Sequence, residues 1–302
     1  MVSKIGEFSI GALKGFKLSI GKSYAQIISD CGCNVNKLVL KGQDIILGNS
    51  NEEDLLNKKD AKSVIAIPFC GRVDDAKYTF EKKNHQLYIN RPKEGNAIHG
   101  LLYNKKFDFV KKEVANDFVS ITFSHEIKKE DFNGYPFHIF VMLTFILEEN
   151  KLTVMINATN KGNSDAPYGV GWHPYFKFDK EYSDFALLIP SHTLLEIKKG
   201  TIGIPTGEVY KNKHLPTFDL IGDAVFDDCF TNLTNLEAYV ENVTIFWDKS
   251  IDFLQIYTSK DKKSIAIEPM SCAQDAFNNH MGLKILKPGE TKSNFFGVRL
   301  DN

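Results

Sequence analysis

Four short segments of the chain place acidic and basic side chains among aromatic and turn residues. These segments span residues 68–73, 96–100, 171–176 and 265–270. A carboxylate and an imidazole that converge on a bound molecule can move protons to and from it. Apolar walls with a few converging polar groups are typical of small-molecule sites. The segments therefore predict acid–base chemistry on a small molecule.

Glu268 lies at the end of an apolar run and directly before Pro269. Side chains alternate between the two faces of a strand, so Glu268 points away from the face that Ile265 and Ile267 share. That opposite face is either the floor of a pocket, where the carboxylate would act as a base, or the solvent side of an edge strand. The alternation is compatible with both.

His173 lies within an aromatic run, between Trp172 and Tyr175. A histidine between aromatic rings could line a sugar-binding site, because the rings supply apolar surface and the imidazole supplies a polar group. A buried core histidine with satisfied nitrogens would have the same neighbours. Both interpretations stay open on the pattern alone.

Three further residues are candidates, and each also has an ordinary structural explanation. His99 precedes a glycine and could belong to a turn. Arg72, one of three arginines in the chain, could be a surface residue. Asp227 and its neighbour Asp228 could form a solvated turn.

The sequence contains no motif that would hold a metal or a nucleotide cofactor. It has no His-x-His, His-Glu-x-x-His or Cys-x-x-Cys spacing and no glycine-rich phosphate cradle. It also has no Gly-x-Ser-x-Gly elbow for an acyl-transfer serine. We therefore expect acids and bases that act without a cofactor or a metal.

The composition is that of an ordinary globular protein, with 302 residues, 43% hydrophobic and 25% charged, and a formal net charge of −1. Nucleic acid is not an expected partner, because nothing here suggests clustered positive charge.

The five cysteines are scattered, which favours reduced, buried thiols. The chain has no run of 18 apolar residues, and its first residues lack the apolar core of a signal peptide. We expect a cytoplasmic location without membrane contact.

Short strands are predicted along nearly the whole chain. Phenylalanine occurs 23 times, and residues 16–20 and 118–123 alternate between apolar and polar side chains. Helix is suggested only at residues 52–62 and 275–280. No linker or repeat interrupts the pattern, so residues 1–302 are expected to form a single domain of the all-β class, a large β-sandwich.

Several motifs of the chain occur together in a specific order. They are Gly71-Arg72, Asn96-x-x-His99-Gly100, Gly134-Tyr135-Pro136, His173-Pro174-Tyr175-Phe176, Pro205-Thr206-Gly207-Glu208, Asp227-x-x-Phe230, Glu268-Pro269 and Pro288-Gly289-Glu290. In this order the chain resembles the aldose 1-epimerase (galactose mutarotase) family over most of its length. The resemblance implies a galactose mutarotase-like supersandwich whose substrate is a monosaccharide, a free aldohexose, and which interconverts its α- and β-anomers.

The resemblance also implies a role for each candidate residue. Glu268 would be the general base, ionised at the start, and His173 the general acid, protonated at the start. The residues that would hold the sugar are His99, Arg72, Asp227, Trp172 and Tyr175. Arg72 would also lower the pKa of Glu268, and Asp227 is favoured over Asp228 because an aromatic residue follows it three positions later. Residues 168–172 depart from typical galactose mutarotases, which leaves the preferred aldose open.

Three other functions remain open at this point. A sugar-phosphate 1-epimerase of the glucose-6-phosphate type would need a phosphate clamp, which Arg91 or lysines could supply. A non-catalytic carbohydrate-binding sandwich could use the same aromatic rings without a paired acid and base. A retaining glycosidase would use Glu268 and Asp227 as two carboxylates about 5–5.5 Å apart.

Overall fold

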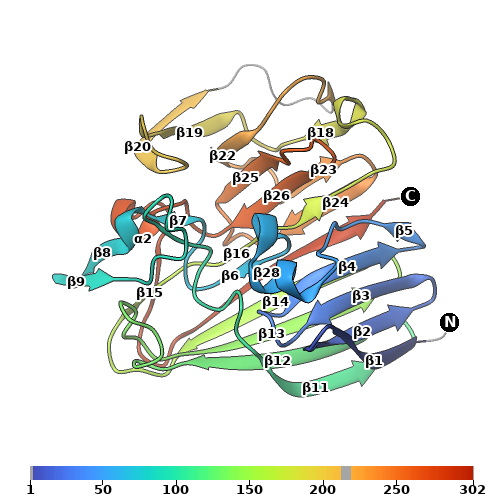
Figure 1. The fold of residues 1–302 in the computed structure, drawn as a ribbon, viewed down its shortest axis with the longest axis horizontal. Helices are drawn as coiled ribbons and strands as arrows, with labels where there is room; N and C mark the ends of the chain where they lie inside the picture. The colour runs from blue at the N-terminus through green and yellow to red at the C-terminus, as the bar shows by residue number, and fades with distance from the viewer. Residues whose placement is uncertain (1–2, 212–218, 302) are drawn as a thin grey trace.

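Within residues 3–211 and 219–301, which the computed structural model describes, the chain forms three large antiparallel sheets and three two-stranded ones (Figure 1). The five-stranded sheet consists of β1 (Ser3–Ile10), β2 (Leu13–Ile20), β3 (Ser23–Ile28), β4 (Asn34–Leu40) and β5 (Gln43–Asp44). The nine-stranded sheet has the order β11 (Asp108–Val114), β12 (Val119–Ile127), β13 (Ile139–Glu148), β14 (Lys151–Asn160), β28 (Thr291–Leu300), β24 (Val243–Trp247), β23 (Glu237–Val240), β18 (Ala186–Leu188) and β21 (Asp219–Leu220).

The eight-stranded sheet carries most of the candidate site. Its strands are β20 (Pro205–Lys211), β19 (Thr193–Ile197), β22 (Asp227–Thr231), β25 (Phe253–Thr258), β26 (Ile265–Met270), β16 (Gly171–Trp172) and β6 (Ile65–Ala66), with β17 (Tyr175–Phe176) also paired to β26. The two-stranded sheets are β7 (Arg72–Val73) with β10 (Ala97–Ile98), β8 (Lys77–Phe80) with β9 (Lys83–Gln86), and β15 (Ala166–Tyr168) with β27 (Lys284–Leu286).

Alternating side chains explain the long strands in the middle of the nine-stranded sheet. In β13 and β14, every second residue is buried and the residues between are partly exposed. This is the pattern of a sheet with one face on a core. The buried face carries a continuous row across four strands, formed by Ile121, Phe145, Val154 and Phe296.

Both other large sheets pack on this same face, which makes the sandwich (Figure 1). Phe16 of β2 contacts Phe123 of β12, with ring centroids 5.5 Å apart. Trp172 of β16 stacks on Phe296 of β28, also at 5.5 Å. The predicted all-β class and the large β-sandwich are confirmed. One buried apolar cluster contains side chains from all three sheets. The single domain expected for residues 1–302 stays a prediction.

The described residues contain little helix. Residues 52–62, predicted as one helix, form α1 (Glu52–Leu56) and a separate 3-10 turn, Lys59–Ala61. The break occurs because the backbone of Lys58 is left-handed, with φ of 49°. The turn predicted at 275–280 is present as α2 (Ala276–Asn279). Two further 3-10 turns are Asp74–Ala76 and Tyr182–Asp184. None of the helices in the described ranges has the length and apolarity needed to cross a bilayer.

Candidate active site

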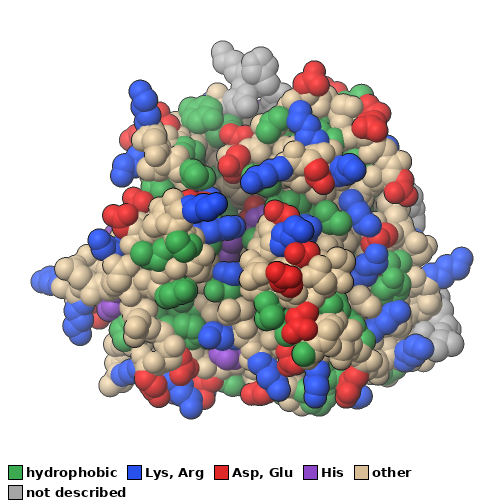
Figure 2. All heavy atoms as spheres, viewed as in Figure 1, with side chains coloured by type: hydrophobic (Ala, Val, Ile, Leu, Met, Phe, Trp, Pro, Cys, Tyr) green, Lys and Arg blue, Asp and Glu red, His purple; other side chains and the backbone are tan. Residues whose placement is uncertain are grey.

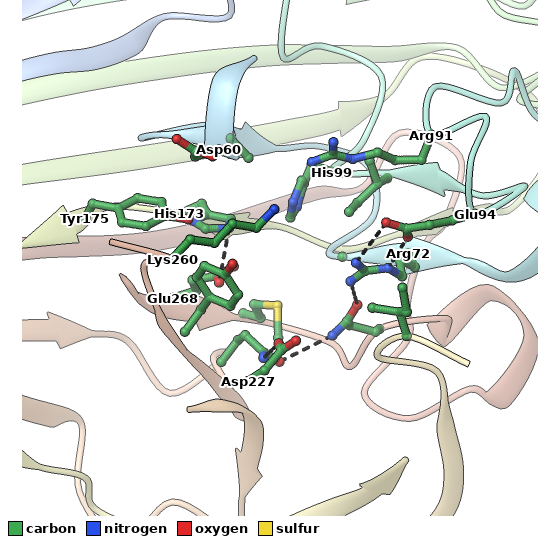
Figure 3. Close-up of a pocket in the computed structure, with 18 residues that line it drawn as sticks. Asp60, Arg72, Arg91, Glu94, His99, His173, Tyr175, Asp227, Lys260 and Glu268 are labelled. Carbon is green, nitrogen blue, oxygen red and sulfur yellow. Dashed lines mark hydrogen bonds and ion pairs between the residues drawn. The ribbon is translucent and has the colours of Figure 1, made fainter. Parts of the chain in front are cut away.

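A cavity of about 300 Å³ opens on one face of the eight-stranded sheet. Its lining includes six of the seven residues expected to form the site, which are Arg72, His99, His173, Tyr175, Asp227 and Glu268 (Figure 3). In Figure 2, histidine side chains are visible inside a hollow near the middle of the face, with lysine and arginine side chains beside it. Residues far apart in the sequence therefore converge on one pocket.

The floor of the pocket is one face of three neighbouring strands. Gln255 of β25 lies opposite Glu268 of β26, and Asp227 of β22 lies opposite Tyr257 of β25. All four line the cavity, because residues two apart on a strand share a face. Ile267 lies on the other face, in the core, as the alternation predicted for Glu268.

The choice between the two adjacent aspartates follows from the same alternation. Asp227 lines the cavity. Asp228 lies opposite Ile256, which belongs to the core face of the sheet. Burial raises the pKa of Asp227, an effect that the charge of Arg72 opposes.

Glu268 and His173 form a contact pair at the floor of the cavity. Glu268 Oε1 lies 3.3 Å from His173 Nε2, and the two side chains are only 7% and 10% exposed. Burial raises the pKa of Glu268 well above its usual range; the charge of Asp227 adds to this effect and that of Arg72 opposes it. Burial also lowers the pKa of His173 to about 3. The charge of Arg72 thus lowers the pKa of Glu268, as expected, but the opposite effect of desolvation is larger.

These two shifts favour a carboxylic acid beside a neutral imidazole, whereas the family roles begin from a carboxylate beside an imidazolium. The two forms contain the same number of protons. They differ only in whether one proton resides on Glu268 or on His173. The pair therefore holds one transferable proton in either form, and a molecule bound between the two groups can relay it.

We expect the pH profile of kcat/KM to lack the acid-side fall near pH ~6.5 that an ordinary histidine would cause. The pair gains a second proton only near the lowered pKa of His173, about 3. It loses its transferable proton on the alkaline side, at the raised pKa of Glu268. Buffer-corrected mutarotation rates from about pH 4 to about pH 9 measure this. A loss of activity centred near pH ~6.5 on acidification would show that His173 titrates like an exposed histidine.

The ring of His173 is oriented by packing. Its backbone pairs with residues 63 and 64, since Ser63 N donates to His173 O and His173 N donates to Val64 O. Its imidazole stacks on Tyr175, with centroids 5.1 Å apart, and meets the ring of His99 edge-on at 5.0 Å. Nδ1 is buried without a hydrogen-bond partner among the described residues, so Nε2, which faces Glu268, is the nitrogen placed for proton transfer.

His99 occupies a tight turn that brings its ring into the cavity. Its φ is 58°, and Gly100 follows with φ of 76°. A Cβ at Gly100 would lie 2.2 Å from the carbonyl oxygen of Ile67, so only glycine fits there. Burial lowers the pKa of His99 well below its usual value, and His173 adds to this shift. A neutral imidazole can both donate and accept hydrogen bonds, which suits a hydroxyl-bearing ligand.

A chain of hydrogen bonds connects Arg72 to Asp227. Arg72 Nε donates to Glu94 Oε2 at 2.7 Å, and Arg72 Nη1 donates to Gln274 Oε1 at 3.0 Å. Gln274 Nε2 donates to Gln255 Oε1 at 3.3 Å, and Gln255 Nε2 donates to Asp227 Oδ1 at 3.1 Å. Every donor in this chain points from the guanidinium toward the carboxylate. Asp227 therefore uses Oδ1 as the final acceptor, and within residues 3–211 and 219–301 its Oδ2 has no hydrogen bond, so it can accept one from a ligand.

We expect Gln274→Leu to raise KM about tenfold, because it removes a hydrogen bond to a charged group and disconnects Arg72 from Asp227. The value of kcat should change much less, since no proton-transferring group is altered. Initial rates against sugar concentration separate the two effects. Gln43→Leu, on β5 and outside the cavity, is the control. A fall in kcat at constant KM would mean that the chain acts on the reaction step.

The expected contact between Trp172 and a sugar is wrong. The indole is 1% exposed and stacks on Phe296 of the nine-stranded sheet. It lies in the core because β16 packs directly on that sheet. Neighbouring residues in the chain thus point to different places, with Trp172 in the core and His173 in the cavity.

The cavity also contains residues that sequence analysis did not assign to the site. They are Asp60, Glu94, Gln255, Tyr257, Lys260 and Gln274, together with Arg91, which was considered only as part of a phosphate clamp. Gln255 could have been found, since it is the polar residue inside the apolar run of β25. Tyr257 is on the same strand, two residues later, and the remaining ones lie in turns and loops without a pattern. Among the described residues, no group of His, Cys, Asp and Glu side chains could hold a metal ion.

The chain is similar to several proteins of known sequence. A family model for aldose 1-epimerase matches residues 15–298. The chain is 25% identical over 305 residues to the uncharacterized protein YihR of Escherichia coli, covering 93% of this chain and 91% of that protein. It is 26% identical over 210 residues to galactose mutarotase of Rattus norvegicus, covering 66% of this chain and 58% of that protein.

A solved structure shares the fold. The crystal structure of a galactose mutarotase-like protein from Clostridium acetobutylicum superimposes with a TM-score of 0.88 at 22% identity, covering 99% of both chains. The agreement extends over the sheets that form the cavity as well as over the remainder of the sandwich. Because the family model spans nearly the whole sequence, the chain belongs to the aldose 1-epimerase family.

Proposed function

We propose that this protein is a mutarotase that interconverts the α- and β-anomers of a free aldohexose. The observation that carries the proposal is the contact between Glu268 and His173, 3.3 Å apart and buried at the floor of the cavity. The cavity volume of about 300 Å³ is at the small end for ligand sites, which suits a single sugar ring. Membership of the aldose 1-epimerase family supports the reaction class.

The reaction needs one base and one acid. Glu268 removes the proton from the anomeric hydroxyl, and His173 donates a proton to the ring oxygen as the bond between that oxygen and the anomeric carbon breaks. The open aldehyde rotates about the bond between its first two carbons. The ring then closes on the other face, His173 recovers its proton from the attacking hydroxyl, and Glu268 returns its proton to the carbonyl oxygen. Both groups end in their starting states.

Burial assists ring opening. After the two proton transfers, Glu268 is a carboxylic acid and His173 is a neutral imidazole. These are the forms that burial favours, because desolvation raises the pKa of Glu268 and lowers that of His173. The buried environment that destabilises the ion pair therefore favours both proton transfers, one from His173 to the ring oxygen and one from the anomeric hydroxyl to Glu268.

The remaining residues of the cavity hold the sugar. Asp227 and Arg72 offer an acceptor and donors for hydroxyls, and neutral His99 offers both. Tyr175 lines the cavity and stacks on His173, which fixes the orientation of the imidazole toward the sugar. The buried carboxylate in contact with an imidazole favours catalysis over simple binding, and it favours ring opening over glycoside hydrolysis by two carboxylates.

Polarimetry of freshly dissolved α-glucose and α-galactose tests the proposal. We expect the optical rotation to reach equilibrium faster in proportion to enzyme concentration, with a rate that saturates with sugar. Saturable sugar binding without any acceleration would mean a carbohydrate-binding protein instead. Release of reducing sugar from a glycoside would mean a glycosidase.

A further inference from the structure

Two carboxylates and two cations reach the cavity from different elements. Asp227 and Glu268 lie on the sheet floor. Arg91, from the loop before β10, and Lys260, from the turn after β25, extend toward the middle of the cavity in Figure 3. We call the part of the cavity at Arg91 and Lys260 its cationic side.

The acids near the cationic side already have partners. Glu94 accepts hydrogen bonds from Arg72, and Asp60 lies 3.7 Å from Lys62 in an ion pair. Within residues 3–211 and 219–301, neither the guanidinium of Arg91 nor the ammonium of Lys260 has a hydrogen bond or an ion pair. These two cations are free to bind a ligand that enters the cavity.

The positive charge at this side is concentrated enough to affect its neighbours. Burial together with the charge of Arg91 lowers the pKa of Lys58 to about 7. The charge of Arg91 also contributes to lowering the pKa of His99 and of His173. Like charges held together disfavour one another unless an anion joins them. A guanidinium is the side chain best suited to the planar or tetrahedral oxygens of a carboxylate or phosphate.

We propose that the preferred substrate is an aldose that carries an anionic group, with its anomeric carbon between Glu268 and His173 and its carboxylate or phosphate on Arg91 and Lys260. This inference rests on the proposed mutarotase reaction and goes beyond it, because it makes a charged aldose the preferred substrate over an uncharged one. The sugar phosphate considered from the sequence is one member of this class, and a uronic acid is another. A cavity of about 300 Å³ accommodates one ring with one such substituent.

The test compares glucose, glucose 6-phosphate and glucuronate as substrates in the mutarotation assay. We expect kcat/KM to be higher for at least one anionic sugar than for glucose. Arg91→Ala should lower kcat/KM for the anionic sugar about 10- to 100-fold, the effect of losing a charged hydrogen-bonding partner, with a much smaller change for glucose. Lys260→Ala should act in the same direction but less, since a lysine binds as a single point charge. Lys93→Ala is the matched control, an exposed cation of the same loop outside the cavity lining.

The two anionic sugars distinguish the sources of the charge. A preference for glucose 6-phosphate assigns the site to phosphate, and a preference for glucuronate assigns it to carboxylate. Equal kcat/KM for all three sugars, or an Arg91→Ala effect no larger than that of Lys93→Ala, would overturn the inference while leaving the mutarotase function intact.

Sugar binding measured by isothermal titration calorimetry tests the inference even if the protein turns over no sugar. Tighter binding of an anionic sugar than of glucose, weakened by Arg91→Ala and by added salt, would support the anion site although the proposed reaction had failed. Binding of the anionic sugars no tighter than that of glucose would exclude the site.

Discussion

Glu268→Gln is expected to lower kcat about 10²- to 10⁴-fold, the usual contribution of a positioned general base. Glutamine has nearly the same shape, so it can occupy the same buried position opposite Gln255 and keep a polar contact with His173. It cannot accept the proton of the anomeric hydroxyl. Mutarotation rates at saturating sugar measure the loss, and circular dichroism with thermal unfolding verifies that the fold is retained.

Asp228→Asn is the matched control for this variant. It also removes one carboxylate from a strand of the same sheet, but its side chain lies on the face that it shares with Ile256, outside the cavity lining. We expect it to keep kcat close to that of the wild type. A Glu268→Gln enzyme with wild-type kcat would mean that another group removes the proton.

His173→Asn is expected to lower kcat by a similar factor, about 10²- to 10⁴-fold, because the amide cannot donate a proton to the ring oxygen. The backbone bonds of residue 173 to Ser63 and Val64 do not depend on its side chain, so the local fold should persist. The variant should also alter the pH profile, since Glu268 then titrates without its imidazole partner. Rates at saturating sugar across the pH range measure both effects.

His125→Asn is the control for the loss of an imidazole. His125 is on β12, outside the cavity lining, and its ring bonds to the backbone of Lys106. We expect its kcat to match that of the wild type. Full activity of His173→Asn would remove His173 as the acid and leave His99 as the other imidazole of the cavity.

Much of the fold and part of the site could be predicted from the sequence because strands follow a period of two. The alternation around Glu268 correctly separated it from Ile267, and one face of that strand is indeed in the core. The same rule does not identify the partners of a strand. That Gln255 lies opposite Glu268 depends on the register of β25 on β26, which no local pattern specifies.

Other parts of the site depend on contacts between distant segments. Gln274 reaches Arg72 across 202 positions of sequence, and Arg91 and Lys260 enter the cavity from separate loops. The error at Trp172 has the same origin, since proximity to His173 in the chain gave no information on the sheet that covers its indole. The helix predicted at 52–62 failed because a left-handed residue, Lys58, cannot be recognised from periodicity.

The arrangement of the pocket floor has a consequence for changes in chain length. Asp227, Gln255 and Glu268 share one face of three paired strands. Inserting or deleting one residue within β25 or β26 would turn the following side chains of that strand to the opposite face. Apolar side chains of the core would then enter the cavity, and polar ones would enter the core. A change of one residue in chain length inside β25 or β26 is therefore incompatible with activity, even where the altered strand still pairs with its neighbours.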